Sequence, residues 1–280
     1  MASRERALCR VQPYRLTWLR MKRLNSKVKT FRYLSALLML LSLFSCSGKS
    51  AVKPAEEFNA EKFFAKANKL IDNKDYAEAR AVLLEIRNRD LTKKFAPLAQ
   101  LRIADSYVKE EETELAVAEY RKFLEMYPDH RHAAYAQYQI AMVYFNLIES
   151  PERGNSGAAS ALAEFEKLKR DFPRNPYKDL IGIRIEKCQN VMADYEFLVG
   201  EFYMKKESYA AAIERFEGLI KSYPAYKMRE KVLLDLAISY KKSGQKEKSA
   251  EYLKNLIEKY PASPFTADAK KELSSLQKSK

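Results

Sequence analysis

LRIADSY, at residues 101–107, returns 37 residues later as YQIAMVY at residues 138–144, with its isoleucine-alanine pair and its last tyrosine kept. The same interval relates residues 200–203 to residues 237–240, where a small residue is again followed by a tyrosine. Self-similarity at a fixed interval of this length is typical of proteins built from stacked units, each of which buries its apolar face against the next. We therefore expect the chain to fold as a row of repeated units.

Each of four units ends at an aromatic residue followed by proline. Before each pair, apolar residues recur at helical spacing, as at Ala116, Tyr120 and Phe123, which predicts an amphipathic helix. Proline cannot continue a helix, so each pair marks a helix end. Only seven glycines in 280 residues also favour helices over sheets. The pairs are Tyr127-Pro128, Phe172-Pro173, Tyr223-Pro224 and Tyr260-Pro261.

Helix, turn, helix and terminating proline make up the tetratricopeptide pattern. Small residues where the two helices of a unit meet allow close approach, and a tyrosine one turn later fills the gap toward the next unit; these small residues are Ala104, Ala141, Gly200 and Ala237. The pattern predicts an all-α, right-handed helical solenoid of about five repeats. The expected units are roughly residues 58–95, 96–130, 132–176, 192–226 and 229–264.

Two segments interrupt this regularity. Residues 149–157 are rich in glycine, serine, proline and asparagine and should form a loop that lengthens the third unit. Residues 178–193 add about one helix, so a linker helix is expected at 177–193, between repeats one to three (58–176) and the C-terminal part (192–280). Residues 177–205 as a whole should form one long helix or two nearly continuous ones.

Two smaller predictions concern helix ends. In the first unit, Asp75 followed three residues later by Glu78 fits a capping box that opens the second helix. After Pro264, residues 267–280 are polar and should form a terminal helix that caps repeats four and five.

A targeting signal is predicted over residues 1–45. Basic residues precede the apolar run Leu34–Phe44, which is too short to span a bilayer permanently. The run ends in Ser45-Cys46, which resembles the lipobox of bacterial lipoproteins, although Phe44 is an unusual residue at its position. We therefore expect cleavage between Ser45 and Cys46 and attachment of a diacylglycerol and an N-acyl chain to Cys46. An ordinary signal peptide with an incidental cysteine is the alternative.

The segments on either side of the apolar run give two further predictions. Residues 1–20 would make an unusually long polar leader, so translation is expected to begin at Met21. Residues 46–57 should form the lipidated cysteine and a flexible tether, because residues 47–55 lack apolar periodicity.

The formal net charge of +14 arises mostly from the targeting segment. Residues 1–45 contain ten basic residues and one acidic residue, whereas the rest of the chain contains 41 basic and 36 acidic residues, a surplus of five. No compact basic stripe with interleaved aromatic residues is visible, so nucleic acid is not an expected partner.

Catalytic and metal-binding patterns are missing, which predicts a protein that is not an enzyme and needs no metal or cofactor. Cys188 lies in a helical pattern and should be a buried apolar residue. His130 and His132 flank Arg131 at a turn, and both are expected to be solvated rather than metal ligands. The acidic stretch 110–112 should likewise be a solvated loop.

With the lipobox and five units in place, the chain resembles the BamD family of outer-membrane β-barrel assembly lipoproteins. The resemblance covers nearly everything after Cys46 and is most specific at residues 158–173, Tyr177, the inserted helix and residues 195–203. It implies a lipid-anchored scaffold on the periplasmic face of the outer membrane, whose partners are a BamA-like barrel insertase, other assembly lipoproteins and unfolded outer-membrane clients.

The same resemblance assigns roles to two regions. The C-terminal repeats would dock the insertase, with Arg215, ahead of Glu217-Gly218, as the candidate for an ion pair across the interface. A groove between residues 60 and 145 would receive the aromatic-ended signals of clients. A tetratricopeptide pilotin that assists secretin or pilus assembly is the alternative function, but it would not explain the inserted helix. A periplasmic coordinator of envelope constriction would carry a coiled coil, which residues before 58 lack.

Overall fold

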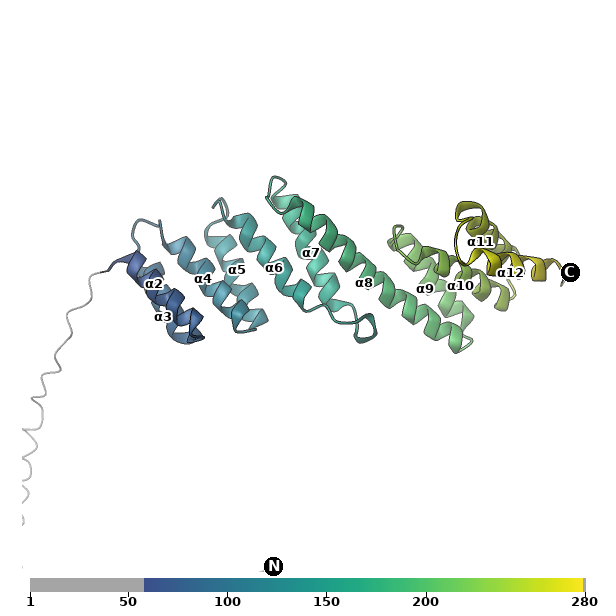
Figure 1. Cartoon of the computed structure of the whole chain (residues 1–280), viewed down its shortest axis with the longest axis horizontal. Coiled ribbons are helices and arrows are strands. Elements are labelled where there is room, and N and C mark those ends of the chain that lie inside the picture. Colours follow the sequence, from purple (N-terminus) through teal and green to yellow (C-terminus); the bar gives the residue numbers. More distant parts are fainter. Residues whose placement is uncertain (1–57, 279–280) are drawn as a thin grey trace, which may run out of the picture. The chain divides into compact units, whose positions relative to one another are not determined.

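The computed structural model describes residues 58–278, and every regular element in this part is helical (Figure 1). The predicted signal, Met21, Ser45, Cys46 and the tether lie outside the described residues. Between residues 58 and 278 no helix combines the length and the apolar composition needed to cross a bilayer. The helices are α2 (Ala60–Asp72), α3 (Tyr76–Arg89), α4 (Ala96–Lys109), α5 (Thr113–Met126), α6 (Ala133–Asn146), α7 (Ser156–Asp171), α8 (Lys178–Lys205), α9 (Tyr209–Ser222), α10 (Arg229–Lys242), α11 (Lys246–Lys259) and α12 (Thr266–Lys278).

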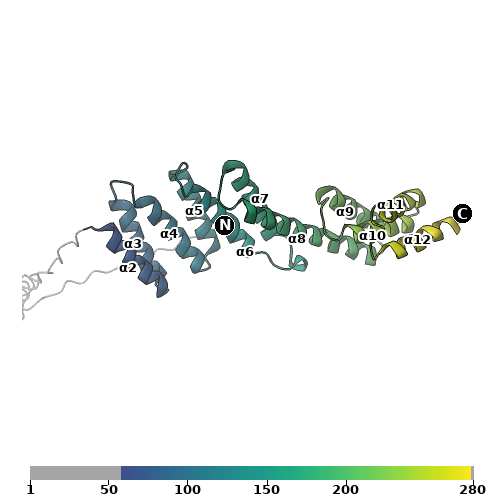
Figure 2. The same ribbon diagram turned by 45° about the horizontal axis from the view of Figure 1, so that its top comes forward.

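Each helix packs against the helices before and after it in the chain, as the two views of Figures 1 and 2 show. The pairs α2–α3, α4–α5 and α10–α11 are helix–turn–helix units, α6 and α7 form a similar pair with a longer connection, and the end of α8 forms another with α9. The buried apolar side chains accordingly form successive clusters along the array rather than one central core. The all-α solenoid of tetratricopeptide-like units is confirmed, whereas its right hand stays a prediction.

The small residues predicted at the helix crossings are all buried. Ala104, Ala141 and Ala237 have no exposed surface. At Gly200 the approach is closer still, because a Cβ atom added there would lie 2.4 Å from Cε1 of Phe216 on α9. A side chain larger than hydrogen therefore does not fit between α8 and α9 at this point.

Tight turns within the units explain why the predicted capping box is wrong. Asp75 occupies the N-cap position of α3, but its side chain makes no capping hydrogen bond. Its backbone N–H instead donates to the Leu70 carbonyl (2.8 Å), after Lys74 has turned the chain with φ +67°. Glu111, Glu207 and Gly244 take the same left-handed conformation at the corresponding turns.

Helix α8 continues for 28 residues, so the alternative of a single long helix is the one observed. Residues 178–193 are thus the first part of α8, with Tyr177 at its N-cap, rather than a separate linker helix. The N-terminal half packs Ile181 and Cys188 against α7, and the C-terminal half packs Phe197 and Gly200 against α9. One helix therefore belongs to two neighbouring units.

The loop of the third unit and the end of the chain complete the fold. The segment 149–157 is not entirely loop, because it contains a 3₁₀ turn, η2 (Pro151–Arg153), and the first residues of α7. Helix α12 packs Ala269 and Leu276 against the apolar side chains of α10 and α11, where a terminal helix is predicted.

Candidate functional site

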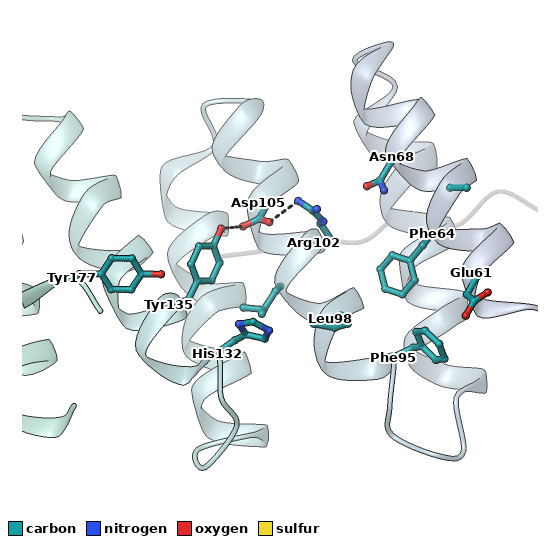
Figure 3. A pocket seen from close by; sticks show the side chains of 12 residues that line it. Glu61, Phe64, Asn68, Phe95, Leu98, Arg102, Asp105, His132, Tyr135 and Tyr177 are labelled. Atoms are coloured by element: carbon teal, nitrogen blue, oxygen red, sulfur yellow. Dashed lines mark hydrogen bonds and ion pairs between the residues drawn. The ribbon is translucent and has the colours of Figure 1, made fainter. Parts of the chain in front are cut away.

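A groove of about 800 Å³ lies along the first helices of the first three units, and its far end is formed by the residue before α8 (Figure 3). Helix α2, helix α4 with the residue before it, and the start of α6 supply the rest of the lining. Figure 3 shows Phe64 and Phe95 at one end of the groove and Tyr177 at the other. The lining residues are Glu61, Phe64, Ala65, Asn68, Phe95, Leu98, Leu101, Arg102, Asp105, His132, Tyr135 and Tyr177.

The end of the groove near α2 is apolar. The rings of Phe64 and Phe95 are tilted by 45° to each other with centroids 6.2 Å apart, and Leu98 on α4 lines the same part of the groove. Aromatic rings provide a large apolar contact area at a low cost in conformational entropy. This end therefore suits an aromatic or aliphatic side chain of a bound peptide.

The middle of the groove is built around the carboxylate of Asp105. It accepts hydrogen bonds from the hydroxyls of Tyr120 (2.6 Å) and Tyr135 (3.0 Å) and pairs with Arg102 (3.3 Å), as Figure 3 shows for Tyr135 and Arg102. Burial, followed by the negative charge of Asp105, raises the pKa of Tyr135 to about 12, and the same causes raise the pKa of Tyr120. Both phenols therefore remain protonated donors, and they hold Asp105 in place beneath the exposed guanidinium of Arg102.

The histidines lie at a turn, as predicted, but both are only partly solvated. His130 is partly buried, with its ring edge-on to Phe123 at a centroid distance of 5.6 Å, and His132 lines the groove beside Tyr135. Burial, followed by the charges of His132 and Arg131, lowers the pKa of His130. Among residues 58–278 no group of three histidine, cysteine or acidic side chains is arranged to hold a metal ion.

Cys188 and Arg215, for which the sequence predicts a buried thiol and a partner-binding cation, do not line the groove. Cys188 is buried in the seam between α7 and α8, and burial raises its pKa to about 11, which keeps the thiol protonated. Arg215 is 45% exposed on α9, and its guanidinium is 3.1 Å from the carboxylate of Glu196 on α8. Arg215 is thus available on the surface but already paired within the chain.

The acidic stretch 110–112 is only partly the solvated loop that was predicted. Glu110 forms an ion pair with Arg80 on α3 (2.6 Å), and the Arg80 guanidinium also lies 4.1 Å from the ring centroid of Tyr107. This contact joins the first unit to the second. Glu111 and Glu112 are exposed.

Comparison with known families identifies the chain. Residues 56–254 match the family model YfiO, described as an outer membrane lipoprotein. The chain belongs to this family. The match spans the groove, the whole of α8 and the Arg215–Glu196 pair, and the resemblance to the BamD family is confirmed because relatives of that name match along most of the chain.

Three of these YfiO-family relatives are each named outer membrane protein assembly factor BamD. The protein of Neisseria meningitidis serogroup A is 27% identical and the alignment covers 82% of this chain and 91% of that protein. The protein of Rickettsia prowazekii is 28% identical, and the alignment covers 85% of this chain and 95% of that protein. The protein of Vibrio cholerae is 25% identical, with 82% of this chain and 99% of that protein covered.

Solved helical-repeat structures resemble the chain only distantly. The TPR2AB domain of yeast Sti1 in its complex with pHSP90 is 15% identical, with a TM-score of 0.44 over 79% of this chain and 83% of that one. The MamA protein is also 15% identical, with a TM-score of 0.30 over 71% and 90% of the two chains.

Several groove residues were not singled out in the sequence. Arg102 and Asp105 lie on the repeat stretch 101–107 itself, and Phe95 directly precedes α4. The signal that could have placed these three residues in the groove is their position in the repeat. Each lies on, or directly before, the first helix of a unit, and the first helices of the first three units line the groove. Tyr177 carries part of the family resemblance, but its place in the groove was not expected.

Proposed function

We propose that this chain is an outer-membrane protein assembly factor that acts as a non-enzymatic scaffold. The match of residues 56–254 to the outer membrane lipoprotein family carries the proposal, together with relatives whose names state that activity. A solenoid suits the role because its helices present long surfaces to partners while their packing keeps the array rigid.

The groove of the first three units is proposed to receive unfolded clients. Phe64, Phe95 and Leu98 would bind an apolar side chain at the end of an extended segment, and the cation of Arg102 lies within the same groove. An extended peptide that lies in a preformed groove loses little binding energy to rearrangement of the scaffold.

Anchoring is proposed through Cys46. Cleavage before this residue and its acylation would leave the chain attached to the periplasmic face of the outer membrane by a diacylglycerol and an N-acyl chain. Each buried CH₂ group contributes about 0.8 kcal/mol, so several acyl chains make the attachment effectively permanent. The partners would then be a BamA-like insertase, other assembly lipoproteins and the clients.

Co-purification from solubilised outer membranes tests the scaffold role. Material purified through a C-terminal tag is expected to bring down a large barrel protein with tandem periplasmic domains, and mass spectrometry should find acyl chains on Cys46. A Cys46→Ala variant should be released into the soluble periplasm with its repeats folded. Recovery of a secretin in place of the barrel protein would contradict the proposal.

Client binding is tested by titrating the purified chain with a fluorescent peptide that ends in an aromatic residue. Phe64→Ala and Arg102→Glu should each weaken binding about tenfold or more. Arg153→Glu is the matched control, because Arg153 is 71% exposed on η2 and does not line the groove. Equal weakening by all three variants would argue against the groove as the binding site.

A further inference from the structure

The loop between α3 and α4 differs from the other corners of the array. Counting back 37 residues from Tyr127-Pro128 leads to Asp90-Leu91, so a leucine stands where the four later corners carry proline. Leu91 is 92% exposed, more than any other exposed large hydrophobic residue in the described part of the chain. The first corner therefore presents an isolated apolar side chain to its surroundings.

The exposure of Leu91 is built into the loop. The carboxylate of Asp90 accepts hydrogen bonds from the backbone N–H groups of Thr92 (3.1 Å) and Ala96 (2.9 Å), and also from that of Phe95. These bonds fix the backbone on both sides of the corner, with Asp90 itself buried. Leu91 is thus held outward by a rigid loop.

The charge around Leu91 is positive. Lys93 and Lys94 follow it and are both exposed, and within residues 58–278 neither forms an ion pair. The negative charge of Asp90 is turned inward to backbone N–H groups, and Arg89 and Glu85 pair with each other (2.6 Å). The only contact of these two charges given by the structure within residues 58–278 is that of the Lys94 Nζ, 5.0 Å from the ring centroid of Phe95. An exposed apolar side chain beside two lysines that form no ion pair fits a membrane surface, which is apolar beneath a layer of anionic headgroups.

The loop also lies where the anchor would bring it close to a bilayer. The guanidinium of Arg89 is 4.8 Å from the ring centroid of Phe58, the first described residue, so this corner adjoins the point where the array begins. Eleven residues, 47–57, separate Cys46 from Phe58, and the twelve steps of the chain between them reach at most roughly 40 Å when extended.

We propose that the loop 90–95 is a membrane-contact site, in which Leu91 inserts into the leaflet that holds the anchor and Lys93 and Lys94 meet anionic headgroups. The inference rests on the proposed lipid anchor at Cys46. The contact would fix the orientation of the first unit, and with it the groove end at Phe95, relative to the bilayer.

A fluorescent probe tests the contact. The full lipidated chain carrying Leu91→Cys is labelled with an environment-sensitive dye and reconstituted into vesicles of phosphatidylethanolamine and phosphatidylglycerol. Cys188 is buried and should not react with the dye. We expect a blue-shifted emission that nitroxide-bearing lipids quench several-fold. The matched control is Leu115→Cys on α5, which is 47% exposed and lies on a different unit, and its dye should stay in water.

Lipid charge provides the second comparison. The double variant Lys93→Asn with Lys94→Gln should reduce the quenching of the dye at position 91 in these anionic vesicles. With both lysines present, the quenching should also be lower in vesicles of pure phosphatidylcholine, which carry no net charge. Asparagine is chosen because Lys93 has φ +56°, a conformation that asparagine tolerates.

The outcomes separate the inference from the function on which it rests. If the chain floats with the vesicles but the dye at position 91 remains in water, the membrane contact is refuted and the anchor stands. Burial of the dye only after purified assembly partners are added would identify a protein interface and also refute the contact. A chain that does not float at all overturns both the anchor and the contact.

Discussion

Gly200 shows how one missing side chain sets the distance between two helices. In Gly200→Ala the new Cβ would lie 2.4 Å from the fully buried Phe216 ring, so the ring or the two helices would have to shift. We expect the free energy of unfolding to fall by about 1–3 kcal/mol, as for overpacked cores. Urea unfolding monitored by circular dichroism measures the change.

Gly182 provides the control for this substitution on the same helix. A Cβ atom added there meets nothing within 4 Å, so Gly182→Ala should leave stability unchanged or raise it by up to about 1 kcal/mol through helix propensity. Equal effects of the two substitutions would mean that the close approach of α8 and α9 does not exist in solution.

Asp90 should make stability depend on pH. Burial by itself raises the pKa of Asp90, but hydrogen bonds from Thr92, Phe95 and Ala96 outweigh it and hold the pKa below its ordinary value. A depressed pKa in the folded state means that the ionised group stabilises the fold above its unfolded pKa of about 4, and that this stability is lost as the pH falls through the folded pKa. Asp90→Asn should lower stability at pH 7 by about 1–3 kcal/mol.

The test is the melting temperature of both proteins between pH 7 and pH 3. The gap between the unmutated chain and Asp90→Asn should narrow toward the acid end. Asp129→Asn, at an exposed position on the next corner, is the control and should change the melting temperature much less. A gap that stays constant with pH would show that the charge of Asp90 is not what stabilises the loop.

Helix α8 ties together the two units that share it. Asn190 lies near its middle, where proline would remove a backbone hydrogen bond and clash with the preceding turn. Asn190→Pro should lower the free energy of unfolding by about 3 kcal/mol or more, and hydrogen exchange should accelerate around residues 186–194.

Asn190→Ala separates the backbone effect from the loss of the side chain. The Nδ2 of Asn190 donates to the Glu186 carbonyl (3.0 Å), a bond within the helix that contributes little, whereas its Oδ1 atom is buried without a partner. Removal of the side chain should therefore be neutral or slightly stabilising. If Asn190→Pro were as stable as Asn190→Ala, the helix would not be continuous at this position in solution.

At the level of elements, periodicity and proline predicted most of the fold. Apolar spacing and the aromatic-proline pairs indicated the helices and their ends because both act locally along the chain. The choice between one and two helices at residues 177–205 stayed open, since no proline interrupts that stretch and only packing against α7 and α9 decides it. The capping box at Asp75 failed because the turn at Lys74, rather than the side chain, determines the start of α3.

The sequence predicted where along the chain the groove lies but not which residues line it. Its expected range, residues 60–145, contains every lining residue except Tyr177, which the packing of α8 beside α6 and α7 brings to the groove. Tyr138 shows this contact, because its ring stacks on that of Tyr177 at a centroid distance of 4.1 Å. The Arg102–Asp105–Tyr135 arrangement joins residues of two units, and spacing within one unit cannot reveal it.

For the whole molecule, the surface at Arg215 is predicted to serve partner docking rather than folding. Arg215→Glu should weaken capture of the barrel partner but lower the melting temperature by no more than about 1–2 °C, because exposed ion pairs contribute little to stability. Thermal unfolding and quantitative co-purification of the same variant measure the two effects.

A charge exchange sharpens this test. The double variant Arg215→Glu with Glu196→Arg would restore an ion pair between α8 and α9 in the opposite sense. Its stability should match that of the unmutated chain while docking remains weak. Docking restored together with the internal pair would show that docking depends on the ion pair between α8 and α9 and not on a positive charge at position 215. A large fall in melting temperature for the single variant would make Arg215 a structural residue.

The double membership of α8 also limits how such a protein can change over evolutionary time. Repeat arrays can lengthen or shorten by whole units when each unit is a separate module. Here, copying or deleting the third or the fourth unit alone would cut a helix through its middle, between residues that pack on α7 and residues that pack on α9. Gain or loss of units that leaves α8 intact is therefore confined to the segments on either side of this helix, and the spacing between α7 and α9 is inherited as one indivisible length.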